Sequence, residues 1–222
     1  MKNLVFLDVE TTGLNGSTDR IIEIYMLKVE YSGDVAEYHS LINPVRAIPM
    51  KITEITGITG RDLQNAPFES SISNSIRSFI GDGAIVAHNL SFDLRFLEAL
   101  FQRNQCAPLT GGGVDTLAIS RDLFPKLCIY PEGGGSHRLK NLMYHFGLDK
   151  DYENSHRAKD DVMLLVQVYR HLEQYASGHL SYPKAVTHGC PACGSAMLLQ
   201  AKGTQRELVC VKGRSCSQRL VV

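Results

Sequence analysis

The chain lacks any hydrophobic run long enough to cross a membrane, and it lacks an excess of charge of either sign. A membrane-spanning helix needs about 20 consecutive apolar residues, and no segment approaches that length, so we expect no membrane partner. The 23 basic residues balance 23 acidic ones, and an apolar fraction of 44% is ordinary for a packed soluble protein. Internal repeats and glycine-rich phosphate-binding motifs are also missing from the sequence.

Overall neutrality conceals an uneven distribution of charge. From residue 179 onward the only acid is Glu207, so the six basic residues give this tail a net charge of +5 and leave −5 for the rest of the chain. A basic segment beside an acidic domain suggests contact with phosphates, although a charge of this size also fits a tail that is merely soluble. The basic residues are Lys184, Lys202, Arg206, Lys212, Arg214 and Arg219.

Four of the six cysteines lie in the same tail, as C-x2-C and C-x5-C separated by 16 residues. Four thiolates on two turns suit a closed tetrahedral zinc site. So short a tail cannot form a stable hydrophobic core unaided, and we therefore expect a structural Zn²⁺ to stabilise its fold. A disulfide alternative is weak in a reducing cytosol. The expected ligands are Cys190, Cys193, Cys210 and Cys216.

A pair of carboxylates follows the first apolar run of the chain. Leu4–Leu7 lead directly into Asp8-Val9-Glu10, and residues two apart in a strand project to the same face. Paired carboxylates are costly unless a positive charge lies between them, and oxygen ligands suit Mg²⁺ or Mn²⁺. The alternative is an exposed acidic strand end, because Asp-x-Glu alone is common.

Two later segments supply further acids at predicted helix starts. Asp93 falls in the first turn of a predicted helix over 90–104, where we expect it to look out beside the core face. Asp161 is expected to begin a last helix, with His156 on the loop before it. The helix dipole alone would also explain acids at these positions.

These motifs together resemble the DEDD exonucleases of the ribonuclease-H-like superfamily, in the histidine-bearing subgroup that includes the proofreading subunit of bacterial replicative polymerase and ribonuclease T. The resemblance covers roughly residues 1–175, with the motifs in the family's order. One departure is Thr56 in a Thr-Gly-Ile-Thr string where many relatives carry histidine. The matching strings are Asp8 to Leu14 (Asp-x-Glu-Thr-Thr-Gly-Leu), His88 to Asp93 (His-Asn-x-x-Phe-Asp), Asp115-Thr116-Leu117, and His156, Ala158 and Asp161 (His-x-Ala-x-x-Asp).

The resemblance implies a complete two-metal nuclease site. Two Mg²⁺ or Mn²⁺ ions would be held by Asp8, Glu10, Asp93 and Asp161, with Asp8 bridging them. His156 would be the general base, a task that suits an imidazole near neutral pH. The expected contacts to the terminal 3′ nucleotide are Thr11, Thr12, Gly13, Leu14, Asn89 and Phe92, of which Phe92 fits core packing equally well and Asn89 is as well explained by positioning the second motif.

The predicted fold is α/β: a ribonuclease-H-like mixed five-stranded sheet with helices on both faces, followed by a small zinc ribbon. The expected organisation is an exonuclease domain over 1–176, a linker over 177–187 and the ribbon over 188–222. Strands are predicted at 3–9, 20–30, 35–43, 83–87 and 114–116, and helices at 68–80, 90–104, 116–123, 138–146 and 158–175.

The tail resembles the four-cysteine zinc ribbons of bacterial type I topoisomerases, which bind single-stranded DNA. No aromatic residue lies between Pro183 and Val222, so base stacking is not available from this tail, and binding would rest on phosphate contacts. Ribbons also mediate protein contacts, so docking to a replication or repair protein stays open.

The N-terminus runs directly into the strand that carries Asp8, so a cleavable leader would remove that acid, and we expect a cytoplasmic protein. The expected activity is metal-dependent 3′-to-5′ hydrolysis of single-stranded DNA, releasing nucleoside monophosphates in repair or proofreading. The sequence leaves two alternatives: a 3′-to-5′ exoribonuclease, and an inactive nucleic-acid- or protein-binding module.

Overall fold

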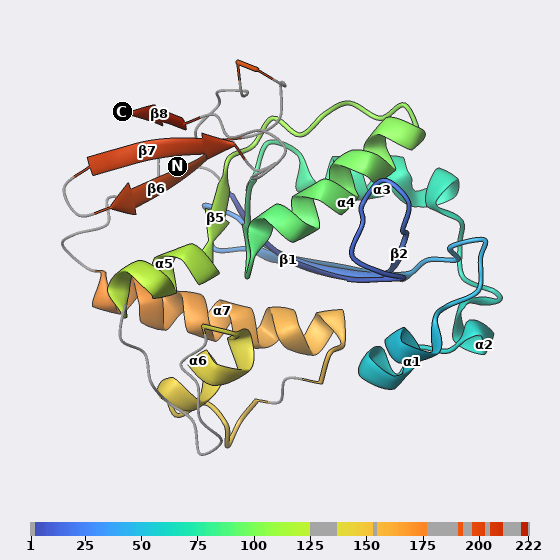
Figure 1. Ribbon diagram of the computed structural model, residues 1–222, viewed down its shortest axis with the longest axis horizontal. Helices are drawn as coiled ribbons and strands as arrows, with labels where there is room; N and C mark the ends of the chain where they lie inside the picture. The colour runs from blue at the N-terminus through green and yellow to red at the C-terminus, as the bar shows by residue number, and fades with distance from the viewer. Residues whose placement is uncertain are drawn as a thin grey trace.

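A five-stranded mixed sheet forms the centre of the computed structural model, which describes residues 3–124, 137–152, 155–176, 191–192, 197–202, 205–210 and 219–221. The strand order is β3-β2-β1-β4-β5 (Figure 1). The first three strands form an antiparallel meander, and the last two run parallel to β1. The strands are β1 (Leu4–Thr11), β2 (Ile21–Val29), β3 (Val35–Leu41), β4 (Ala84–Ala87) and β5 (Gly113–Asp115).

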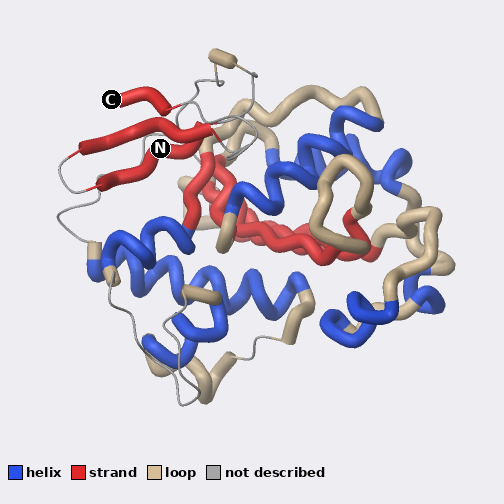
Figure 2. Tube along the Cα trace, viewed as in Figure 1, coloured by secondary structure: helices blue, strands red, loops and turns tan. Residues whose placement is uncertain are grey.

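Helices cover both faces of this sheet (Figure 2), as the sequence predicts. One face packs against α3 (Glu69–Ile80) and α4 (Leu90–Arg103). The other packs against α7 (Ala158–Tyr175), which is accompanied by α5 (Thr116–Leu123) and α6 (Leu139–His145). The predicted α/β class and five-stranded sheet are therefore confirmed.

Alternation along β1 decides where its acids point. Val5, Leu7 and Val9 belong to the core on the α4 side, whereas Phe6 belongs to the core beneath α7. Because side chains two apart share a face, Asp8 and Glu10 continue the side of Phe6. The two acids therefore project from the sheet where α7 begins.

The sequence analysis did not predict two short helices that the structure contains. α1 (Met50–Thr56) follows Pro49, and Gly57 ends it in a left-handed conformation with φ of 72°. The next residue, Ile58, is buried, and Thr59 then begins α2 (Gly60–Leu63) with a capping box to Asp62. The Thr-Gly-Ile-Thr string thus forms the turn between two helices, where glycine is favoured for its φ.

The tail contributes a second, three-stranded antiparallel sheet in the order β6-β7-β8. These strands are β6 (Met197–Lys202), β7 (Gln205–Cys210) and β8 (Arg219–Val221). The predicted linker over 177–187 and three of the four predicted zinc ligands, Cys190, Cys193 and Cys216, lie outside the described residues. Within the part of the chain that the structure describes, no helix is both long and apolar enough to span a bilayer.

Candidate active site

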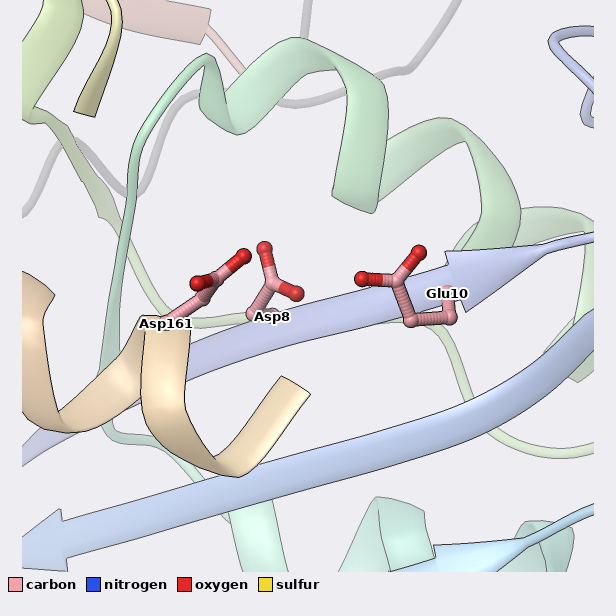
Figure 3. A group of neighbouring side chains, drawn as sticks. All are labelled: Asp8, Glu10 and Asp161. Carbon is pink, nitrogen blue, oxygen red and sulfur yellow. The ribbon is translucent and has the colours of Figure 1, made fainter. Parts of the chain in front are cut away.

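Three carboxylates meet at the junction of β1 and α7. Ligand oxygens of Asp8, Glu10 and Asp161 all lie within 4.8 Å of one another. Figure 3 shows Asp8 and Glu10 projecting from the same side of β1, with Asp161 reaching toward Asp8 from the first turns of α7. Residues separated by about 150 positions in the chain therefore share one small volume, as the sequence motifs predict.

Helix α7 begins at Ala158, the first residue of the range predicted for it. The expectation that Asp161 itself begins the helix is wrong, because Asp161 is the fourth helical residue. The side chain of Arg157 at the N-cap position makes no capping bond. The cap comes instead from a distant strand, because the N–H of Ala158 donates to Glu23 Oε2 at 3.2 Å. As the fourth residue of the helix, Asp161 is buried, at 7% exposure.

Asp93 lies beside this cluster rather than within it, and its predicted orientation was wrong. It stands in the first turn of α4 but is only 3% exposed, so it does not look out to solvent. Pairing between β4 and β1 stops at Phe6, and the backbone N–H of Val9 farther along β1 hydrogen-bonds the Asp93 carboxylate. An unpaired stretch of strand edge thus draws this acid inward.

Burial and mutual repulsion make the acids costly to ionise without a cation. Burial, followed by the charges of Asp161 and Glu23, raises the pKa of Asp8 to about 8. Burial, followed by the charges of Asp8 and Asp161, raises the pKa of Glu10 to about 9. Burial and the charge of Asp8 also raise the pKa of Asp93 well above its ordinary value. An all-oxygen donor set of this kind fits a hard divalent cation.

His156 occupies an exposed loop in a backbone conformation that is rare for its residue type. Its φ is 54°, in the left-handed region that ordinarily favours glycine or asparagine. On one side, Ser155 Oγ donates to Asp160 Oδ2 at 2.6 Å. On the other, the guanidinium of Arg157 donates to Glu23. The histidine is therefore fixed between two anchored neighbours.

Glu23 is the residue that the sequence prediction missed. It lies in β2 directly opposite Glu10 of β1 and is 1% exposed. Burial alone would raise the pKa of Glu23, but hydrogen bonds from Arg157, His39 and Ala158 hold it below its ordinary value. The sequence does contain a signal for this residue, which is a lone acid within the apolar string Ile-Ile-Glu-Ile. A charge in a buried strand requires partners, so such an acid is expected to be bonded to other groups of the fold.

A separate set of hydrogen bonds joins the second motif, at the start of α4, to the end of β5 and the start of α5. His88 Nδ1 lies 2.9 Å from Thr116 Oγ1, and His88 Nε2 lies 2.7 Å from the carbonyl of His137. Asp115 Oδ1 accepts from the backbone N–H of Asn89 at 3.0 Å and from that of Leu117 at 3.0 Å. These contacts join the start of α4 to the start of α5, and so fix the helix that carries Asp93.

Asn89 and Phe92, two of the predicted substrate contacts, lie at the start of α4. Asn89 is exposed and left-handed, with φ of 71°, and it occupies the N-cap position of α4 without a side-chain capping bond. Phe92 is half-buried and packs against Phe96, with ring centroids 5.0 Å apart. The core-packing alternative for Phe92 is therefore realised, and the remainder of its ring is exposed.

The loop after β1 is internally braced. Thr11 Oγ1 donates to the Gly13 carbonyl at 2.6 Å, and the N–H of Thr12 donates to the Arg20 carbonyl at 2.9 Å. Thr12 Oγ1 donates to Asp19 at 3.3 Å. Leu14 is 79% exposed at the end of this braced segment. The threonine hydroxyls thus hold the loop in shape, and the leucine side chain is presented to solvent.

The comparisons with known proteins agree with this geometry. The family described as Exonuclease (RNase_T) matches residues 5–169. The chain belongs to this exonuclease family. Its domain is of the DEDD type with a ribonuclease-H-like fold, and the match takes in Asp8, Glu10, Asp93, His156 and Asp161.

Two relatives indicate where such domains occur. The exonuclease is 38% identical over 162 residues to the DNA polymerase III subunit epsilon of Treponema pallidum (strain Nichols), covering 73% of this chain and 72% of that protein. It is 35% identical over 171 residues to a DNA polymerase III PolC-type protein of Mycoplasma pneumoniae. That match covers 77% of this chain but only 11% of the much longer polymerase.

A solved structure shows the same fold. E. coli exonuclease I in complex with a dT13 oligonucleotide superimposes with a TM-score of 0.67 at 20% sequence identity. The match covers 80% of this chain and 42% of exonuclease I. The five-stranded sheet and its helices are therefore shared with a solved exonuclease.

Proposed function

We propose that this exonuclease hydrolyses single-stranded DNA from its 3′ end in the cytoplasm, releasing nucleoside monophosphates in proofreading or repair. The observation that carries the proposal is the convergence of Asp8, Glu10 and Asp161 within 4.8 Å, beside Asp93. The relatives support the substrate: one is a subunit of a DNA polymerase, and the solved exonuclease I holds a DNA oligonucleotide.

The four acids would hold two divalent cations, Mg²⁺ or Mn²⁺, with Asp8 as the shared ligand. When bound, such ions lower the pKa of a coordinated water and neutralise charge on the attacking and leaving oxygens. The raised pKa values of Asp8 and Glu10 support the assignment, because burial and the neighbouring acids outweigh the effect of the Arg157 charge on Glu10, and a bound cation would supply the missing compensation.

His156 would act as the general base, and the enzyme would then belong to the histidine-bearing subgroup. The proposal is supported by its position: His156 is exposed on the loop just before the helix that carries Asp161. A side chain in this role takes the proton from the attacking water and must lie within hydrogen-bond reach of it.

The braced loop after β1 would receive the terminal 3′ nucleotide. Thr11, Thr12 and Gly13 set the backbone there, and the exposed side chain of Leu14 is free to contact the base. Asn89 and the exposed part of the Phe92 ring would border the same nucleotide.

Replacing Gly13 with alanine tests the role of this loop. A Cβ at Gly13 would collide with the carboxylate of Asp19, which accepts the N–H of Asn15 at 3.0 Å. We expect KM for a DNA 3′ end to rise about tenfold, or about 1.4 kcal/mol, through displacement of Leu14. Gly60→Ala is the matched control, because a Cβ there meets nothing within 4 Å. An unchanged KM in Gly13→Ala would exclude the loop from substrate binding.

The substrate class is tested with matched DNA and RNA oligomers carrying 3′ or 5′ labels. We expect rapid metal-dependent release of mononucleotides from the 3′-labelled DNA and slower digestion of RNA. Faster cleavage of RNA would identify an exoribonuclease. Intact oligomers that nevertheless bind, with Mn²⁺ present, would identify an inert binding module.

We further propose that the tail over 188–222 is a zinc ribbon held by Cys190, Cys193, Cys210 and Cys216. The three-stranded antiparallel sheet, with β7 ending at Cys210, supports this assignment. Its excess of basic residues would contact the phosphates of single-stranded DNA, with docking to a replication or repair protein as the competing role.

Deletion of residues 179–222 separates these roles. We expect the nuclease domain to remain folded, because its core clusters draw on β1 to α7. Affinity for long single strands should fall several-fold at low salt and converge with that of the full chain at high salt, because phosphate contacts are screened. Equal affinities at low salt would refute the DNA role of the tail. The measurement is fluorescence anisotropy over a salt series.

A further inference from the structure

We propose that Glu23 is a positioning residue for His156, acting through the guanidinium of Arg157 and the first N–H of α7. The inference rests on the proposed role of His156 as general base. Glu23 comes from β2, and its hydrogen bonds to Arg157 and Ala158 join segments about 134 residues apart in the chain. It thereby fixes the two residues that follow His156.

Every part of the Glu23 carboxylate is occupied. Oε1 lies 2.8 Å from Arg157 Nη2 and 2.9 Å from His39 Nε2. Oε2 accepts from Arg157 Nε at 3.0 Å and from the N–H of Ala158 at 3.2 Å. A bidentate arginine–carboxylate pair fixes direction as well as distance. The group is thus committed to holding the chain, whereas Glu10, its neighbour across the strands, faces the other acids.

The conformation of His156 shows why such an anchor is needed. A left-handed φ of 54° is unfavourable for a residue with a Cβ and persists only where the surroundings fix it. The bond from Ser155 to Asp160 fixes the residue before the histidine, and Glu23 fixes the residue after it. Without Glu23, the second anchor is lost and the backbone at His156 is free to relax to an ordinary conformation.

Asp161 depends less on this anchor. Helix α7 is held against the sheet by a buried apolar face that includes Val162, Leu165 and Tyr169. Loss of Glu23 would therefore disturb the loop at residues 155–158 more than the helix that carries the metal-binding acid. The expected signature is a catalytic defect that runs through His156 alone.

The test combines Glu23→Gln, which keeps the side-chain shape, with His156→Ala in a double-mutant cycle. At saturating Mn²⁺ we expect Glu23→Gln to lower the single-turnover rate about 10²-fold, the scale of a 1 Å misplacement, with substrate affinity changed less than about threefold. In the His156→Ala background the same substitution should lower the single-turnover rate less than about threefold, because the imidazole that Glu23 positions is already missing.

A readout independent of activity is backbone hydrogen–deuterium exchange over residues 155–161. Glu23→Gln should speed exchange there while the sheet remains protected. Glu69→Gln is the matched control, because it removes a similar bidentate pair, with Arg103 at 2.8 Å, far along the chain from this loop. The control should leave exchange at 155–161 unchanged and should combine additively with His156→Ala.

Arg157→Met provides a second route should Glu23→Gln fail to fold, since it removes the guanidinium and leaves the bonds from Ala158 and His39. It should reproduce the exchange and rate changes. Unaltered exchange at 155–161, or additive effects of Glu23→Gln and His156→Ala, would overturn the proposal. If exchange at 155–161 is faster in Glu23→Gln than in wild type, but the wild-type protein cuts no oligomer, the anchor is supported and the proposed function is refuted.

Discussion

Replacing Asp8 with asparagine should abolish metal-dependent hydrolysis and, at the same time, stabilise the metal-free protein at pH 8. Asp8 is the expected shared ligand of both cations, so its loss should reduce the rate at least about 10³-fold, or about 4 kcal/mol of transition-state stabilisation. Hydrolysis of a 3′-labelled strand at saturating Mn²⁺ measures this loss. A rate within tenfold of wild type would refute the metal assignment.

The gain in stability follows from the direction of the pKa shifts. Burial and neighbouring charges raise the pKa of Asp8 from 3.8 to about 8 in the folded protein. Between these values the folded state binds more protons than the unfolded state, so the free energy of unfolding falls as the pH rises from about 4 to about 8. Asparagine at position 8 is neutral over this whole pH range, so the variant does not lose this part of the free energy of unfolding as the pH rises.

The effect is measurable by thermal unfolding in the presence of a chelator. We expect Asp8→Asn to gain on the order of 2 kcal/mol at pH 8, or a Tm about 5 °C higher than wild type, and to gain little at pH 4. Adding Mn²⁺ should reverse the order, because a cation at 100 times its Kd stabilises wild type by about 2.7 kcal/mol. An asparagine variant less stable than wild type at pH 8 without metal would contradict the electrostatic account.

Replacing His156 with alanine should lower kcat by about 10²–10⁴-fold while leaving substrate binding close to wild type. The imidazole is an exposed loop side chain, so its removal costs little packing. Restricting the loss to kcat would indicate a group that acts only in the chemical step. The measurement is a full kinetic titration on a single-stranded oligomer.

Asp160→Asn supplies the control for this substitution. Asp160 is exposed and accepts a hydrogen bond from Ser155 on the same loop. Asparagine retains an acceptor oxygen there, so kcat should change far less than in His156→Ala. Equal losses in the two variants would show that the loop, and not the imidazole, is what matters.

The sequence predicted best where a single periodicity decides the outcome. Alternation in β1 places Asp8 and Glu10 on one face, and nothing in the fold overrides it. The helix α4, predicted over 90–104, extends over Leu90–Arg103 because its apolar spacing is strong.

Predictions failed where a distant partner decides the local structure. The predicted start of α7 at residue 158 is correct, but the group that caps it is Glu23, more than a hundred residues away, and the local sequence does not reveal this partner. Asp93 is buried because an unpaired N–H of β1 draws it inward, which helical spacing alone does not show. The α2 helix was short but readable, since Thr59 and Asp62 form a capping box.

The most direct test of the central claim is a crystal structure of the protein soaked in Mn²⁺, with the ions located by anomalous scattering. Two peaks are expected at the carboxylate cluster, with Asp8 a ligand to both and Glu10, Asp93 and Asp161 completing the set. Crystals of enzyme that is active in solution, yet with no manganese at these acids, would contradict the account.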